Sequence, residues 1–148
     1  MGMPRFDVKS SRQEHLQEFF RRYASFALDE DPTKLAEFYD ASFLAAGPRG
    51  GAAFKNDEAF LAWLRELHAF NVKVGMTSMT VEEVCEVPVG AGYTLATVTW
   101  GAAFQRTGPI PIRFKISYLL RESEAHPKVA ANISHEDQEE VMRARGLL

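Results

Sequence analysis

The segment "IPIRFKISYLL", residues 110–120, restricts the fold more than any other part of the chain. Every second residue in it is apolar, and the residues between are mostly polar. The apolar set is Ile112, Phe114, Ile116, Tyr118 and Leu120. Because side chains of a strand point alternately to its two faces, this pattern predicts a strand with one buried face and one face in water. Such a strand needs neighbouring strands and an apolar cover.

Three more segments of the second half are predicted to be strands: residues 77–89, "GAGYTLATVTWGAAF" at residues 90–104, and residues 129–133. The alternation in the first of them slips near Glu82 and Glu83, which predicts a β-bulge there. Short turns such as "TGP" and "ESEAHP" separate the strands. The second half is therefore predicted to be a mostly antiparallel sheet.

The first half has the spacing of helices instead. Apolar residues recur every three or four positions after Ser11, and Ser11 with Glu14 forms a capping box that predicts the helix start. Residues 1–10 are then expected to be a flexible lead. The apolar stripe of this helix consists of Leu16, Phe19, Phe20, Tyr23 and Phe26.

Two further helices are predicted, one after Asp31 and Pro32 and one over about residues 56–70. Residues 45–54, "AAGPRGGAAF", are rich in glycine and are predicted to be a loop. The apolar side of the second helix comprises Leu35, Phe38, Tyr39 and Phe43, and that of the third comprises Phe60, Trp63, Leu64, Leu67 and Phe70. Helices followed by strands indicate one α+β domain over residues 1–148, with helices on one face of the sheet.

Composition excludes several classes of function. The net charge is −3 and no basic block is present, so no nucleic-acid partner is expected. No apolar run has membrane-spanning length, so no membrane partner is expected either. Cys85, the single cysteine, is interpreted as a buried filler, and a lone thiol fits a reducing, cytoplasmic compartment. The four histidines lack the close spacing of metal ligands, so neither a metal nor a cofactor is expected.

The segment "NISHEDQEEV" contains the strongest candidate for chemistry. Asp137 and Glu140 have the spacing of a helix start, which gives Asp137 a structural role. His135 has the parity of Val129, Ala131 and Ile133, so a regular strand directs its ring to the buried face. Two interpretations stay open: a histidine of the core or pocket rim held by a hydrogen bond, or a histidine with a ligand-binding or catalytic role.

Taken together, these segments resemble the nuclear transport factor 2-like superfamily, which includes SnoaL-like polyketide cyclases and ketosteroid isomerases. The resemblance covers about residues 13–137. It rests on "FFRRYASFALDEDPTKLAEFYDASF" and "NDEAFLAWLREL" for the helices, and on "YTLATVTWGAAF", "IRFKISYLLRE" and "KVAANISHED" for the last strands. It implies a cone-shaped fold, in which a curved sheet wraps around helices and encloses an apolar pocket, and commonly a homodimer through the sheet. Leu95, Ala96 and Val98, on both faces of one strand, also favour a second cover on the sheet.

The resemblance implies a role for Tyr23, which matches the helix tyrosine that donates to the oxyanion in ketosteroid isomerases. The aspartate base of those enzymes is replaced by Gly47, and the strand aspartate falls near Ser117 or Tyr118 and is also missing. Steroid isomerisation by that mechanism is not expected. In SnoaL-like cyclases an inward aspartate or histidine moves the proton, which leaves His135 and His68 as candidates here.

Three hypotheses follow for the function. The first is a pocket enzyme that transfers a proton on a small, apolar cyclic or polyketide-like substrate, with His135 and Tyr23 as catalytic residues. The second is a binding module for a small apolar ligand, and the third is a dimeric interaction protein. Residues predicted to line the pocket, or else to be plain core, are Tyr39, Trp63, Trp100, Phe114 and Tyr118.

Overall fold

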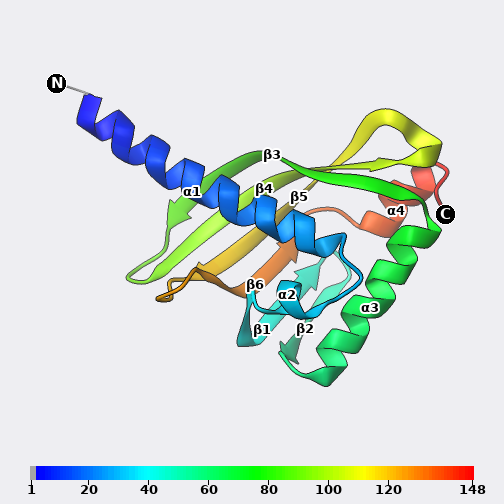
Figure 1. Ribbon diagram of the computed structural model, residues 1–148, viewed down its shortest axis with the longest axis horizontal. Coiled ribbons are helices and arrows are strands. Elements are labelled where there is room, and N and C mark those ends of the chain that lie inside the picture. Colours follow the sequence, from blue (N-terminus) through cyan, green and yellow to red (C-terminus); the bar gives the residue numbers. More distant parts are fainter. Residues whose placement is uncertain (1–2) are drawn as a thin grey trace.

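The computed structural model describes the backbone of residues 3–148 and the side chains of residues 12–148. It is a six-stranded curved sheet with its main helices on one face (Figure 1). The elements in chain order are α1 (Met3–Ala27), α2 (Thr33–Ala36), β1 (Tyr39–Gly47), β2 (Gly50–Lys55), α3 (Glu58–Lys73), β3 (Met76–Pro88), β4 (Tyr93–Phe104), the 3-10 turn η1 (Gln105–Thr107), β5 (Gly108–Arg121), β6 (Lys128–Ser134) and α4 (Gln138–Ala144). The α+β class and the order of helices before long strands are confirmed.

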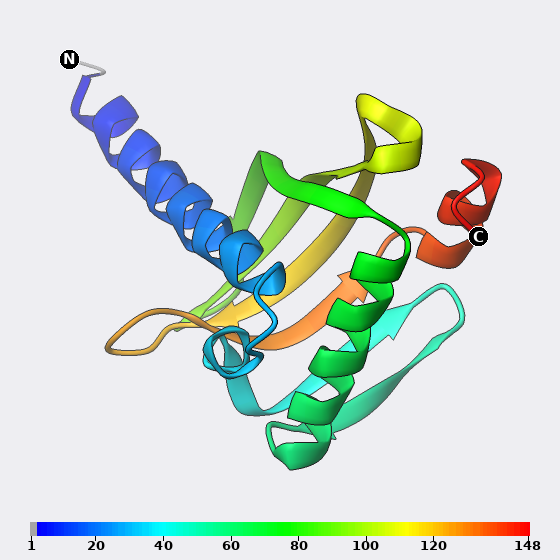
Figure 2. The ribbon, with the colours of Figure 1, turned by 45° about the vertical axis from the view of Figure 1, so that its right-hand side comes forward.

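The strands lie in the order β2-β1-β6-β5-β4-β3. All neighbours are antiparallel except β1 and β6, which are parallel. Helix α1 lies across β3, β4 and β5, and α3 lies in front of the β1–β2 hairpin (Figure 2). The concave face of the sheet, called the inner face below, therefore holds the core. The opposite, outer face carries no helix of the described chain across its strands.

Helix α1 begins at Met3, so the predicted start at Ser11 is wrong, and the backbone from Met3 to Ser10 is helical. The predicted apolar stripe does face the core: Leu16, Phe19, Phe20 and Tyr23 are all buried. Arg12 anchors the helix to the sheet through Glu86 at 3.1 Å, Thr94 at 2.8 Å and Glu122 at 2.7 Å. The helix thus covers the inner face because its apolar side and one ion-pair network both bind there.

The second predicted helix is only one turn long. Asp31 accepts from the Thr33 amide at 3.0 Å, as a helix-start acid should, but α2 ends at Ala36. Strand β1 then begins at Tyr39, and the predicted loop over residues 45–54 is a β1–β2 hairpin with its turn at Pro48 and Arg49. A spacing of four, as between Tyr39 and Phe43, fits both a helix and a strand, so the sequence pattern alone does not separate the two.

Helix α3 and the long strands match the sequence pattern closely. Helix α3 begins after Asp57, whose side chain accepts from the Phe60 amide at 3.2 Å. Strand β3 shows the predicted irregularity, since its register with β4 shifts between Val81 and Glu83. Helix α4 begins after Asp137, which accepts from the Glu140 amide at 3.3 Å, so the predicted capping role of Asp137 is confirmed. Cys85 is exposed, which corrects its interpretation as a buried filler.

A second β-bulge lies within β6 and changes which side chains at the end of this strand face inward. Leu119 pairs with Ala131 but the next residue, Leu120, pairs with Val129, so Ala130 is the extra residue. An extra residue reverses which side chains face in. Beyond the bulge, Asn132 pairs with Tyr118 on the inner face, and Ile133 turns outward and is 50% exposed.

Candidate functional site

A cavity of about 330 Å³ lies between the inner face of the sheet, α3 and the end of α1. Its volume falls in the range of about 300–1,000 Å³ typical of small-molecule pockets. Most of the lining is apolar or aromatic. The lining residues used below are Tyr23, Asp29, Tyr39, Phe43, Phe54, Phe60, Trp63, His68, Met76, Met79, Phe114, Tyr118, Asn132, Ser134 and Gln138.

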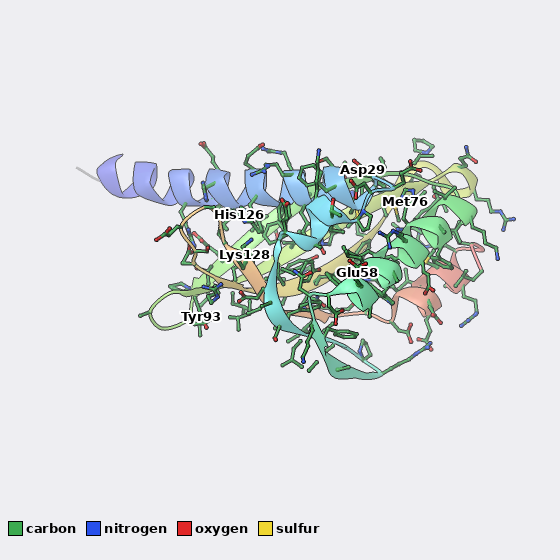
Figure 3. All side chains as sticks on the ribbon, turned by 60° about the horizontal axis from the view of Figure 1, so that its bottom comes forward. Asp29, Glu58, Met76, Tyr93, His126 and Lys128 are labelled. Carbon is green, nitrogen blue, oxygen red and sulfur yellow. The ribbon has the colours of Figure 1, made fainter. Side chains whose placement is uncertain are left out.

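The cavity lies toward one end of the molecule. In Figure 3, Asp29 and Met76, which line it, lie well away from Tyr93, which starts β4 at the opposite end of the sheet. The half-exposed rings of Trp63 and Phe54, 52% and 40% exposed, mark its open side. Each of them stacks on a buried lining ring, Trp63 on Phe60 and Phe54 on Phe43. An aromatic wall therefore leads from solvent into the cavity.

A group of hydroxyls occupies the inner end of the cavity. The Tyr23 and Tyr39 oxygens lie 2.5 Å apart, and the Asn132 amide nitrogen lies 3.4 Å from the Tyr39 oxygen. The Tyr118 oxygen accepts from the indole nitrogen of Trp100 at 3.0 Å. We call Tyr23, Tyr39, Tyr118 and Asn132 the hydroxyl cluster.

Burial determines the protonation state of this cluster. Loss of water around the rings raises the pKa of Tyr23, Tyr39 and Tyr118 well above the usual value for tyrosine. For Tyr23 and Tyr39, a neighbouring tyrosine oxygen adds to this rise in pKa. The three hydroxyls thus stay protonated at neutral pH. They can donate hydrogen bonds to a bound oxygen, and they are unsuited to act as bases.

Few charges accompany the cluster. Among the described side chains, no lysine or arginine lines the cavity, and the acid and imidazole of the lining are Asp29 and His68. Nor does any group of three or more His, Cys, Asp and Glu in the described part of the chain have the placement of a metal site. The arrangement can bind a neutral apolar molecule and hydrogen-bond one of its polar atoms.

Most of the predicted lining residues do surround the cavity. Tyr23, Tyr39, Trp63, Phe114 and Tyr118 all line it. Trp100 does not: it is fully buried behind Tyr118 and donates to that hydroxyl. Its role is to hold Tyr118 in place.

The predicted position of His135 in the cavity wall is wrong. Its side chain is exposed on the outer face, where its Nε2 lies 2.8 Å from the Ser117 hydroxyl. The bulge at Ala130 is the cause, because it shifts the parity on which the prediction relied. The same shift brings in Asn132 and Ser134, which the sequence pattern had placed outside.

His68, the second histidine named from the resemblance, does line the cavity from α3. It is partly buried there, one helical turn after the buried Leu64. Gln138, at the start of α4, lines the cavity as well. No sequence signal identified Gln138, because the loop that places it follows from the pairing of β6 rather than from a local motif.

A curved, mostly antiparallel sheet that holds an apolar cavity against α1 and α3 defines the class of α+β pocket proteins. Residues 10–137 match the family model described as NTF2-like protein (DUF6841), and the chain belongs to this family. The resemblance to the nuclear transport factor 2-like superfamily is thereby confirmed. No curated protein matches the sequence.

Solved structures share the fold at low identity. An NTF2-like protein with a cystatin-like fold from Novosphingobium aromaticivorans is 18% identical, with a TM-score of 0.68 over 99% of this chain and 94% of its own. A provisionally assigned scytalone dehydratase from the same organism is 11% identical, with a TM-score of 0.61 over 87% and 86%. A protein with a ketosteroid isomerase-like fold from Catenulispora acidiphila, in complex with trimethylamine, is 16% identical, with a TM-score of 0.55 over 88% and 94%.

The described helices contain no stretch long and apolar enough to cross a bilayer.

Proposed function

We propose that the protein binds a small, neutral, largely apolar molecule in the cavity and hydrogen-bonds an oxygen of that molecule with the hydroxyl cluster. The observation that carries this proposal is the pair of tyrosine oxygens 2.5 Å apart at the inner end of an apolar cavity. A cavity with a few convergent polar groups is the usual form of a small-molecule site. The volume of about 330 Å³ suits a molecule of one or two fused rings.

The charge of the lining supports a neutral ligand. A carboxylate entering the cavity would lose water and meet no lysine or arginine among the described lining residues, which costs several kcal/mol by the usual penalty for a poorly paired buried charge. The aromatic wall and the thioethers of Met76 and Met79 favour a flat ring, because sulfur and ring faces both contact planar groups well. A bicyclic ketone meets these requirements.

Binding to 1-tetralone, tetralin and 1-naphthoate tests this proposal. The three molecules share a bicyclic skeleton and differ in having a ketone, no oxygen or a carboxylate. The fluorescence of Trp63, at the open side of the cavity, reports the occupancy. We expect the ketone to bind about fivefold more tightly than tetralin, since one hydrogen bond contributes about 1 kcal/mol, and the carboxylate to bind weakest. Equal affinity for ketone and hydrocarbon would contradict the proposal.

A second candidate function is proton transfer of the isomerase or dehydratase type, and the position of His68 favours it. His68 lines the same cavity as the hydroxyl cluster, so a base and hydroxyl donors face one space. An imidazole can remove a proton next to a carbonyl while hydroxyls stabilise the oxygen that gains charge. Two solved structures with this fold, from N. aromaticivorans and Streptomyces avermitilis, are provisionally assigned as dehydratases.

Deuterium exchange next to the carbonyl of 1-tetralone, followed by NMR in D2O, tests the second candidate. We expect exchange faster than in buffer, reduced at least about tenfold in His68→Gln because a positioned acid or base contributes 10²–10⁴-fold. His15→Gln is the matched control, since His15 is exposed on α1. If the unmodified protein binds the ketone but the exchange rate equals that in buffer, the second candidate function is contradicted and the proposed binding is not.

A further inference from the structure

The hydroxyl cluster is built as two series of hydrogen bonds with different starting points. One series starts at the Asn132 amide, passes to the Tyr39 oxygen at 3.4 Å and reaches the Tyr23 oxygen 2.5 Å further on. The other starts at the Trp100 indole and reaches the Tyr118 oxygen at 3.0 Å. The rings of Tyr23 and Tyr118 pack with centroids 5.7 Å apart, so the two series end next to each other.

The chemistry of the starting groups gives each series a direction. The N–H groups of an amide and of an indole donate hydrogen bonds and cannot accept them. Tyr39 therefore accepts from Asn132 and directs its single hydrogen to Tyr23. Tyr23 accepts that bond and directs its own hydrogen to Tyr118, with which it shares a side-chain hydrogen bond. Tyr118 accepts from Tyr23 and from Trp100, so its own hydrogen is left for another acceptor.

We propose that Asn132 is a positioning residue that sets the direction of the Tyr39–Tyr23 hydrogen bond, and so makes the cavity select a ligand oxygen that accepts over one that must donate. The inference rests on the proposed function, whose ligand binds against the hydroxyl cluster. It names the ligand class more closely as a ketone or aldehyde. The hydrogen of Tyr118 then bonds to the carbonyl oxygen, which can only accept.

The fold gives Asn132 this position through the β6 bulge. Asn132 pairs with Tyr118 across β5 and β6, so both side chains leave the sheet on the inner face. Without the extra residue at Ala130, the parity of β6 would turn Asn132 to the outer face. A series of bonds in which each hydroxyl both accepts and donates also polarises the last hydrogen, which strengthens its bond to the ligand.

Replacing Asn132 tests the direction of the tyrosine hydrogen bonds separately from the shape of the cavity. In Asn132→Leu the starting donor is absent and the direction is no longer set. The control is Gln105→Leu, which removes an exposed side-chain amide on η1 that does not line the cavity.

The dissociation constants of 1-tetralone, 1-tetralol and tetralin are measured for each protein at pH 8, with circular dichroism as the check of folding. We expect Asn132→Leu to weaken 1-tetralone about three- to tenfold with tetralin unchanged, since one hydrogen bond is affected. Gln105→Leu should keep the order of the unmodified protein. An unchanged ketone-to-hydrocarbon ratio in folded Asn132→Leu would overturn the inference.

A measurement without ligand distinguishes this inference from the proposed function. The side-chain amide protons of Asn132 are followed by ¹⁵N-edited NMR in the unmodified protein and in Tyr39→Phe. A bond from the amide to the Tyr39 oxygen predicts that one amide proton moves upfield in the variant, whereas the Gln138 amide protons stay in place. Unmoved Asn132 resonances would refute the assigned direction even if 1-tetralone binds. If the Asn132 protons shift but the ketone does not bind, the proposed function is refuted. The assigned direction of the Asn132–Tyr39 hydrogen bond is then still supported.

Discussion

The two faces of the sheet carry similar residue types with different consequences. On the inner face, Trp100 and Tyr118 are buried and bonded to each other beside the cavity. On the outer face, Thr97 and Ser117 are bonded at 2.7 Å, and Ser117 meets His135 at 2.8 Å. Both are series of hydrogen-bonding side chains across neighbouring strands. Only the inner one lies beside the apolar cavity, so the proposed discrimination between ligands is assigned to the inner face.

The apolar residues of the two faces differ in the same way. Inner residues such as Val98 and Leu120 are fully buried, whereas Leu44, Val87 and Ile133 of the outer face are 53%, 57% and 50% exposed. A patch of exposed apolar residues on an ordered sheet is typical of an interaction surface. We propose that a second copy of the chain covers the outer face, with the cavity left on the opposite side.

The largest expected effect belongs to the inner face. Trp100→Ala removes a fully buried indole and the donor to Tyr118. Large aromatic truncations in a core cost about 3–5 kcal/mol of unfolding free energy. Urea unfolding followed by circular dichroism measures the change. A loss below about 1 kcal/mol would mean that the inner face is not the rigid core described here.

The second prediction concerns the outer face. If two copies meet there, the unmodified protein has about twice the 16.6 kDa mass of one chain by light scattering at micromolar concentration. Ile133→Glu then places a charge in the interface and should raise the dimer dissociation constant about 100-fold, as for a central interface residue. Glu18→Gln on α1 is the control, because it changes charge away from this face. A mass of one chain for the unmodified protein rules out the dimer.

The third prediction uses the raised pKa of the buried tyrosines. A group whose folded-state pKa lies above its unfolded value of about 10 holds its proton longer in the folded protein, so its contribution to stability is complete below pH 10 and falls as pH rises further. We expect a steep loss of stability above about pH 10.

Tyr39→Phe should make that alkaline loss shallower and should cost about 1 kcal/mol at pH 8, where only the hydrogen bonds are affected. Tyr93→Phe, at an exposed position, is the matched control. The measurement is the urea midpoint between pH 8 and pH 11. Equal slopes with pH for the two variants would contradict the assignment of the alkaline loss to the hydroxyl cluster.

The smallest expected effect is that of His135→Ala. His135 is exposed and bonded only to Ser117 among the described contacts of its side chain, so we expect a stability change within about 0.5 kcal/mol and an unchanged affinity for 1-tetralone. Asn132→Leu is the comparison, three residues earlier in the chain, within β6 and on the inner face. A His135→Ala variant that loses ligand binding would show that the two faces are coupled.

Much of the fold could be predicted from local patterns. Strand β5 and helix α3 have unambiguous periods of two and about 3.6, and Asp57 and Asp137 occupy helix starts. Strand β2 could not be predicted, because its glycines and alanines have the composition of a loop and its six residues are all exposed. It is a strand because it pairs with β1, and pairing between segments is not written in either segment alone.

The residues of the candidate site also divide into those placed by local sequence patterns and those placed by long-range strand pairing. The sequence placed Tyr23, Trp63, Phe114 and Tyr118 on apolar faces of a helix or a strand and left open whether they line a pocket or fill the core; all four line the cavity. The parity of an uninterrupted strand or helix is a property of the local backbone.

Long-range strand pairing, rather than the local sequence pattern, places Asn132 in the site and His135 outside it. The choice depends on one extra residue at Ala130, between the pairs Leu119–Ala131 and Leu120–Val129. That bulge is fixed by hydrogen bonds of β6 to β5 and, through the Val129 amide, to the Phe38 carbonyl at 2.7 Å. Those partners are distant in sequence, and a single-residue change of register reverses every side chain beyond it.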